Sequence, residues 1–182
     1  VSDWGGTVIV SNKADNFTAE NIIFENSFNK CVSDYELIDG VTANTSAYTD
    51  TSITLDRIAE DFIPTSRAAT ERASAVVIHS DKVQFNGCDF IGSQDTLYFG
   101  ANSSSKSNRG YFSECDIVGM TDFIFGFGNV IFDRCNLTFC GYSDNYTEKA
   151  FITANRAADK GFLFKCCVVD FDASLNSNIP QK

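Results

Sequence analysis

A short motif recurs along the chain and limits how it can fold: phenylalanine, then cysteine three residues later, then an apolar residue two further on. It occurs at steps of 27, 20 and 32 residues. Each occurrence lies in a short segment of alternating apolar and polar residues, as half-buried strands require. Short strands repeated at such intervals are typical of a solenoid of stacked β coils. The four copies are Phe85/Cys88/Phe90, Phe112/Cys115/Ile117, Phe132/Cys135/Leu137 and Phe164/Cys167/Val169, and a fifth, Phe17/Glu20/Ile22, has glutamate in place of cysteine.

Stacked coils would place equivalent residues about one strand spacing apart, roughly 4.8 Å, so the repeated phenylalanines and cysteines should form inward ladders. We predict that these cysteines are buried free thiols, with disulfides or metal ligation as the lesser alternatives. The fold class is all-β, and a jelly roll or sandwich is the competing architecture because it also uses many short strands. We predict a single domain over residues 1–182, with an irregular insert at about 34–70.

The charge of the chain limits its partners. It has 14 Lys+Arg against 24 Asp+Glu, a formal net charge of −10. Such a surface repels a nucleic-acid backbone, so no nucleic-acid partner is expected. No run of 18 apolar residues occurs, and the first residues have neither a basic start nor an apolar stretch. These features predict no membrane span and no signal peptide in this sequence.

Two aspartates share one position in successive repeats. Asp95 follows Phe85 by ten residues, and Asp122 follows Phe112 by ten residues. Both lie in segments that read Gly-x-x-Asp-x-aliphatic-aromatic. If adjacent coils stack in register, the two carboxyl groups lie about one strand spacing apart. Two such neighbours do not both ionise readily, which supplies an acid and an anion at one pH. The alternative is that both aspartates cap backbone groups in turns.

Gln94 and His79 are the other polar residues considered for a site. The amide of Gln94, next to Asp95, could donate a hydrogen bond to a developing oxyanion. In a regular strand the two side chains would point to opposite faces, so a shared site requires a bend or bulge there. His79 is the sole histidine of the chain. It follows an apolar strand with no evident catalytic partner, so we interpret it as an ordinary strand-end residue.

At these residues the sequence resembles the pectin methylesterases. The likeness rests on four segments: Gly92–Tyr98, Asp122–Gly126, the aromatic strand Arg109–Phe112 between them, and Phe17–Asn26. The resemblance implies a right-handed parallel β-helix, expected to be an incomplete part of the full domain, that removes methyl groups from galacturonate esters of pectin and releases methanol. It also implies secretion, which the five Asn-x-Ser/Thr sequons fit, with pectin as the partner, an expected monomer, and no cofactor or metal.

The family's chemistry maps onto individual residues of this chain. Asp122 resembles the nucleophile that attacks the ester carbonyl, and Asp95 resembles the acid and base that protonates methanol and then activates water. Gln94 resembles one oxyanion-site amide. Tyr98 and Phe123 are similar to residues that either contact sugar or pack in the core, and the sequence leaves both alternatives open.

Two family features are missing from the sequence. The family commonly has a Gln-Ala-Val-Ala-Leu strand where this chain has Arg72-Ala-Ser-Ala-Val-Val-Ile78, so Ser74 or Arg72 would have to supply the second oxyanion donor. The Leu-Gly-Arg-Pro-Trp motif, whose arginine holds the nucleophile, is also absent. Arg156 belongs to an earlier strand and is not assigned this role.

Two other functions stay open at this point. One is a pectin lyase or glycosidase of related fold. An inverting glycosidase would need its carboxyl groups roughly 6.5–9.5 Å apart, which exceeds one strand spacing. The other is a non-catalytic carbohydrate-binding or structural β-helix, which the missing arginine and glutamine favour.

Overall fold

The computed structural model describes residues 6–26, 74–92, 94–100, 103–119, 121–139 and 151–171. These residues form fifteen strands and one 3-10 turn, Ser103–Ser105 (η1). None of the helical structure in these ranges is long and apolar enough to cross a membrane. The strands are Gly6–Val10 (β1), Thr18–Glu20 (β2), Ile23–Glu25 (β3), Ser74–Ile78 (β4), Val83–Asn86 (β5), Asp89–Ile91 (β6), Leu97–Phe99 (β7), Arg109–Ser113 (β8), Asp116–Gly119 (β9), Thr121–Gly126 (β10), Asn129–Asp133 (β11), Asn136–Phe139 (β12), Phe151–Asn155 (β13), Gly161–Lys165 (β14) and Val168–Phe171 (β15).

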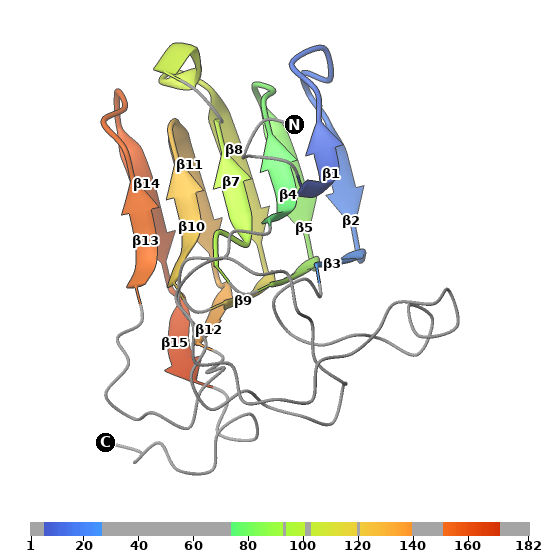
Figure 1. Ribbon diagram of the computed structural model, residues 1–182, viewed down its shortest axis with the longest axis vertical. Helices are drawn as coiled ribbons and strands as arrows, with labels where there is room; N and C mark the ends of the chain where they lie inside the picture. The colour runs from blue at the N-terminus through green and yellow to red at the C-terminus, as the bar shows by residue number, and fades with distance from the viewer. Residues whose placement is uncertain are drawn as a thin grey trace, which may run out of the picture.

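Every third strand joins the same sheet. Sheet A runs β1-β4-β7-β10-β13, sheet B runs β2-β5-β8-β11-β14, and sheet C runs β3-β6-β9-β12-β15. All the pairings are parallel. Each coil therefore gives one strand to each sheet, and five coils follow one another from blue to red (Figure 1). This is a parallel β-helix, so the predicted all-β solenoid is confirmed and the sandwich alternative is wrong.

A single residue turns the chain from sheet B to sheet C in every coil, and it always has a positive φ between 54° and 56°. In the first four coils its backbone N–H donates to a carbonyl of the next coil, as Glu114 does to Asp133 at 3.0 Å. The repeat motif now has a physical explanation. Its phenylalanine faces inward from sheet B, the chain bends two residues later, and the cysteine fills the inside of the corner. The five bend residues are Asn21, Gly87, Glu114, Arg134 and Cys166.

The interior contains the predicted ladders. The rings of Phe85, Phe112, Phe132 and Phe164 stack in order at centroid distances of 5.0, 4.9 and 4.9 Å. The cysteine thiols donate to backbone carbonyls of the preceding coil, as Cys115 Sγ does to the oxygen of Phe85 at 3.4 Å. This weak bond gives the cysteine a role that alanine could not fill. Cys88, Cys115 and Cys135 are completely buried free thiols, and Cys167 is a half-buried one, as predicted.

The fifth repeat copy is wrong by two residues. Ala19, not Phe17, lies opposite Phe85 in the register of β2 with β5. Phe17 instead packs on Phe85 at 5.7 Å with its ring tilted by 51°. A small residue in the ladder position leaves room for this displaced ring. The predicted insert at about 34–70 lies outside the described residues, and the single domain over 1–182 stays a prediction.

Candidate active site

Asp95 and Asp122 take equivalent positions on neighbouring coils. Strands β7 and β10 pair Leu97 with Ile124 and Tyr98 with Phe125. Each aspartate precedes the first of these pairs by two residues. The expected placement on adjacent coils is therefore found at the start of two neighbouring sheet A strands.

The backbone bends at both aspartates. Asp95 has φ of 62° and Asp122 has φ of 50°, in the left-handed region that residues other than glycine seldom adopt. The pairing of β10 with β13 also shifts register between Thr121 and Ile124, which marks a bulge around Asp122. The bend that a shared site of Gln94 and Asp95 requires is thus present. Strained backbone of this kind often occurs at functional sites.

The glycine of each Gly-x-x-Asp segment makes the bend possible. A Cβ on Gly92 would lie 2.8 Å from Oγ1 of Thr96, four residues on. A Cβ on Gly119 would lie 2.7 Å from the same Thr96 oxygen and closer still to Phe123, also four residues on. The chain folds back on these glycines, so the shared motif encodes the bend as well as the carboxylate. Thr96, whose hydroxyl donates to the carbonyl of Val118 at 3.0 Å, ties the two bends together and was not singled out from the sequence.

The polar groups of the pair differ in burial. Asp95 is 3% exposed, whereas Asp122 is half-buried. Gln94 is 8% exposed, and its Oε1 has no hydrogen-bond partner within the described part of the chain. A buried polar atom without a partner is costly and uncommon in native proteins, which makes Gln94 a candidate functional residue.

Tyr98 and Phe123 lie in different surroundings. Tyr98 stacks on Phe125 at 4.0 Å, and the two form a small cluster with Val77 and Ala154, apart from the main core. Phe123 is completely buried inside the main core. Its burial argues for packing and against a sugar contact. The bulge explains this, because Phe123 and its neighbour Ile124 both belong to the interior cluster.

Arg156 lies near this aromatic cluster. Its backbone N–H donates to the carbonyl of Gly126 at 2.7 Å, and its guanidinium Cζ lies 5.5 Å from the centroid of the Phe127 ring. Burial raises the pKa of Tyr98, the Arg156 cation opposes this rise, and the Asp95 carboxylate adds to it. Both charges are therefore close enough to influence the same phenol. No sequence motif indicated this contact, since it joins separate coils.

Of the two residues proposed to replace the missing glutamine, the structure describes Ser74 but not Arg72. Ser74 is 3% exposed and precedes Val76, the register partner of Leu97, by two residues. It therefore occupies on β4 the position that Asp95 and Asp122 occupy on the next two strands. Arg72 lies outside the described residues. His79 follows the far end of β4 and is half-buried, as an ordinary strand-end residue would be.

Metal chemistry has no evident site in this part of the molecule. Within the described ranges, no group of three or more His, Cys, Asp or Glu side chains could hold a metal ion.

Comparison with known proteins identifies the family. The sequence profile of the pectinesterase family matches residues 30–181. The chain is 43% identical over 70 residues to a probable pectinesterase A of Neosartorya fischeri, covering 38% of this chain and 20% of that protein. The structure of a pectin methylesterase from Yersinia enterocolitica aligns with TM-score 0.60 at 32% identity, covering 92% of this chain and 44% of the other. A pectin methylesterase solved with a hexasaccharide aligns with TM-score 0.62 at 22% identity, over 93% and 42% of the two chains.

The extent of these matches is uneven. The chain spans about a fifth to a quarter of the length of the first curated relatives, 20% of one and 24% of another. The family profile nevertheless covers most of this chain, and the β-helix matches in three dimensions. The chain belongs to the pectinesterase family.

Proposed function

We propose that the protein removes methyl groups from the galacturonate esters of pectin. The observation that carries this proposal is the paired position of Asp95 and Asp122, which bend the backbone in the same way on adjacent coils. Membership of the pectinesterase family supports the same reaction. One strand spacing between the two positions also argues against an inverting glycosidase, whose carboxyl groups lie roughly 6.5–9.5 Å apart.

The first half of the reaction uses both aspartates. A carboxylate oxygen of Asp122 attacks the ester carbonyl carbon, and the carbonyl electrons move onto its oxygen. The Gln94 amide N–H stabilises that oxyanion. As the carbonyl re-forms, the bond to the methoxy oxygen breaks and Asp95 donates its proton, so methanol leaves. The product on the enzyme is an acyl group linked to Asp122.

The second half reverses the roles. Asp95, now a carboxylate, takes a proton from water, and the hydroxide attacks the acyl carbon. The bond to Asp122 breaks, which releases a galacturonic acid group and restores the Asp122 anion, and the acid then loses its proton to solvent. Asp95 ends protonated, as it began. One ester and one water thus give one acid and one methanol.

The burial of the three residues supports these assignments. Burial favours the neutral form of a carboxyl group, so the nearly covered Asp95 suits the acid and the more exposed Asp122 suits the anion. Since Oε1 of Gln94 has no partner in the described structure, the amide can turn its NH2 group toward an oxyanion without losing a bond at that atom. Ser74, the next residue in the same row, is the best available second donor.

The direct test is methanol release from methylated pectin by the protein and by its Asp122→Asn variant. The proposal requires release by the first and almost none by the second. Equal release by both would exclude Asp122 as nucleophile. No release by either would favour the alternative, a carbohydrate-binding β-helix without catalysis.

We also propose that the protein acts outside the cell as a monomer, where its polymeric substrate lies. Two sequon asparagines, Asn16 and Asn136, are exposed, as attachment of a glycan requires. Expression through a eukaryotic secretory route, followed by glycosidase treatment and mass measurement, tests whether they are modified. Light scattering measures the oligomeric state.

A further inference from the structure

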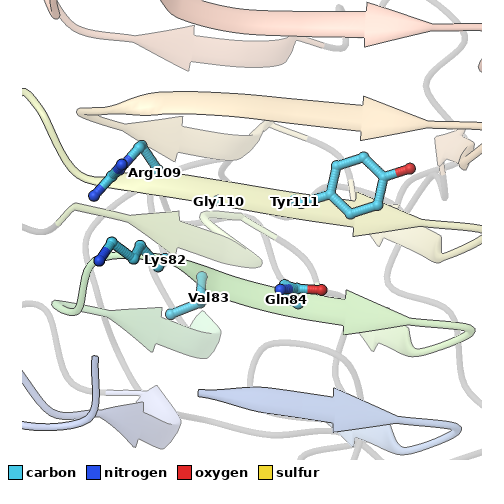
Figure 2. Close-up of a pocket in the computed structure, with 6 residues that line it drawn as sticks. All are labelled: Lys82, Val83, Gln84, Arg109, Gly110 and Tyr111. Atoms are coloured by element: carbon cyan, nitrogen blue, oxygen red, sulfur yellow. The ribbon is translucent and has the colours of Figure 1, made fainter. Parts of the chain in front are cut away.

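A polar depression lies on a different sheet of the β-helix from the proposed catalytic pair. It is an open groove of about 300 Å³ between strands β5 and β8 of sheet B (Figure 2). The proposed catalytic pair belongs to sheet A, so the two sites are on different sheets. The residues that line the groove are Lys82, Val83, Gln84, Arg109, Gly110 and Tyr111.

The register explains how the groove is built. Val83 pairs with Gly110 and Gln84 pairs with Tyr111. Val83 and Gly110 are buried, and a Cβ on Gly110 would lie 2.5 Å from the Phe99 ring, so this pair forms the floor. Gln84 and Tyr111 lie side by side above it, and Lys82 and Arg109 lie together at the other end (Figure 2). The two ends are two residues apart along the strands, roughly 7 Å.

The groove is locally cationic on an acidic protein. None of its lining residues is a carboxylate. Arg109 donates through Nε to Asp81 Oδ1 at 3.1 Å and forms an ion pair with the same carboxylate through Nη2. This arginine holds the pKa of Asp81 below its usual value, so the pair is neutral overall. Lys82 has no ion-pair partner within the described residues, and it leaves one uncompensated positive charge at this end.

Tyr111 provides a fixed aromatic surface at the other end. Its hydroxyl donates to Oδ2 of Asp133 at 2.8 Å. Asp133 is buried and also contacts Arg134 and Lys165, each at 3.3 Å, so the acceptor is itself held in place. Figure 2 shows the ring almost face-on, with the hydroxyl turned away from Lys82 and Arg109. A ring that is already fixed loses little side-chain freedom when a ligand packs on it.

We propose that this groove is a second, non-catalytic site that binds an acidic oligosaccharide. One sugar ring packs its C–H face on Tyr111, where the electron-rich ring attracts polarised C–H groups. Gln84 bonds a sugar hydroxyl, and a neighbouring carboxylate lies at Lys82 and Arg109. That the ligand is a galacturonate chain without methyl groups rests on the proposed function, of which it would be the product.

The test measures binding of unmethylated oligogalacturonate to the protein by calorimetry and by amide chemical shifts. Addition should shift the resonances of Gly110 and Tyr111. Tyr111→Ala and Lys82→Glu should each weaken this binding at least fivefold. Lys160→Glu is the matched control, because Lys160 precedes β14 as Lys82 precedes β5, three coils away. Tyr111→Phe keeps the ring and should weaken binding less than Tyr111→Ala.

The outcomes separate this proposal from the catalytic one. Groove variants should keep wild-type methanol release from a short methylated substrate, whereas Asp122→Asn should lose release and keep groove binding. Shifts confined to sheet A, or wild-type affinity in both groove variants, would overturn the second site. Equal affinity for a neutral oligosaccharide of the same length would overturn the acidic ligand.

Discussion

Asp95 and Asp122 both have a positive φ at the same position of neighbouring coils, each two residues before its member of the Leu97–Ile124 pair. A left-handed φ costs a residue with a Cβ roughly 1–2 kcal/mol, although aspartate and asparagine tolerate it better than most. Two consecutive coils therefore keep the same unfavourable bend. The proposed reaction would account for both bends, because a straight strand would separate the carboxyl groups from Gln94.

Asp122→Asn should lower methanol release by about 10³-fold or more, because the amide cannot attack the ester carbon. Asparagine also tolerates the left-handed bend, so the melting temperature should change little. Asp116→Asn, an exposed change on sheet C, is the control and should keep full activity. Turnover near the wild-type rate in Asp122→Asn would remove the nucleophile assignment.

Substitutions at Asp122 should affect stability and activity differently, because stability depends on the backbone bend and activity on the carboxylate. Asp122→Gly should unfold at a higher denaturant concentration than Asp122→Ala, by about 1 kcal/mol in unfolding free energy, because glycine adopts a positive φ without a Cβ clash. Both variants should be inactive. Denaturant unfolding measures the difference, and equal stabilities would show that the bend is not strained.

Gln94→Met replaces a buried amide with an apolar side chain of similar length. We expect methanol release to fall about 10²–10³-fold, less than in Asp122→Asn, if the amide is one of two oxyanion donors. Stability should stay the same or rise, because the variant removes a buried oxygen without a partner in the described structure. Steady-state kinetics and thermal unfolding check the two halves. A large loss of stability with full activity would contradict both.

Asp133 should make folding depend on acidity. The Tyr111 hydroxyl, assisted by Lys165 and Arg134, holds the pKa of Asp133 below its usual value of 3.8. A folded pKa below the unfolded one stabilises the protein above the unfolded value, and the gain is lost as pH falls through the folded value. The free energy of unfolding should therefore decrease below about pH 4. Asp133→Asn should show a smaller decrease between pH 5 and 2 than wild type.

The cysteine ladder should be inert until the protein unfolds. The bond with Cys135 and burial raise the pKa of the Cys115 thiol. All three ladder thiols, Cys88, Cys115 and Cys135, are completely buried, so a reagent in solution cannot reach them in the folded protein. Cys166 is exposed and should react with a thiol reagent in the native state. Peptide mapping after labelling should find modified Cys166 but unmodified Cys88, Cys115 and Cys135. Labelling of the ladder at the same rate would contradict the fold.

The positions of residues within one coil could be predicted from the sequence, because they depend on short, repeated spacings along the chain. The offset of ten from ladder phenylalanine to aspartate located Asp95 and Asp122 correctly on adjacent coils. Contacts between coils were harder to predict, because the turns differ in length and the sequence does not show which residues of two coils are paired. Phe17 was therefore aligned where Ala19 belongs. The Tyr111–Asp133 bond joins residues 22 apart, and no pattern within either strand indicates it.

Phe123 shows a different limit. Strict alternation would put Phe123 and Ile124 on opposite faces of the strand, so it cannot assign both to the core. The bulge in β10 breaks the alternation, so that Phe123 and Ile124 both lie in the core. Reading a strand by periods of two therefore fails at a bulge.

The short corner between sheets B and C also determines which parts of a coil can differ in length. All five coils have two residues between the sheet B strand and the sheet C strand, although the steps between ladder phenylalanines differ. Variation in length must therefore accumulate at the other two corners, as between β3, which ends at Glu25, and β4, which begins at Ser74. The backbone determines the shape of the B–C corner, because the residue at the bend differs between coils, as Asn21, Gly87 and Arg134 show. The edge between sheets B and C is therefore constant in length and variable in residue type, whereas the other two edges vary in length.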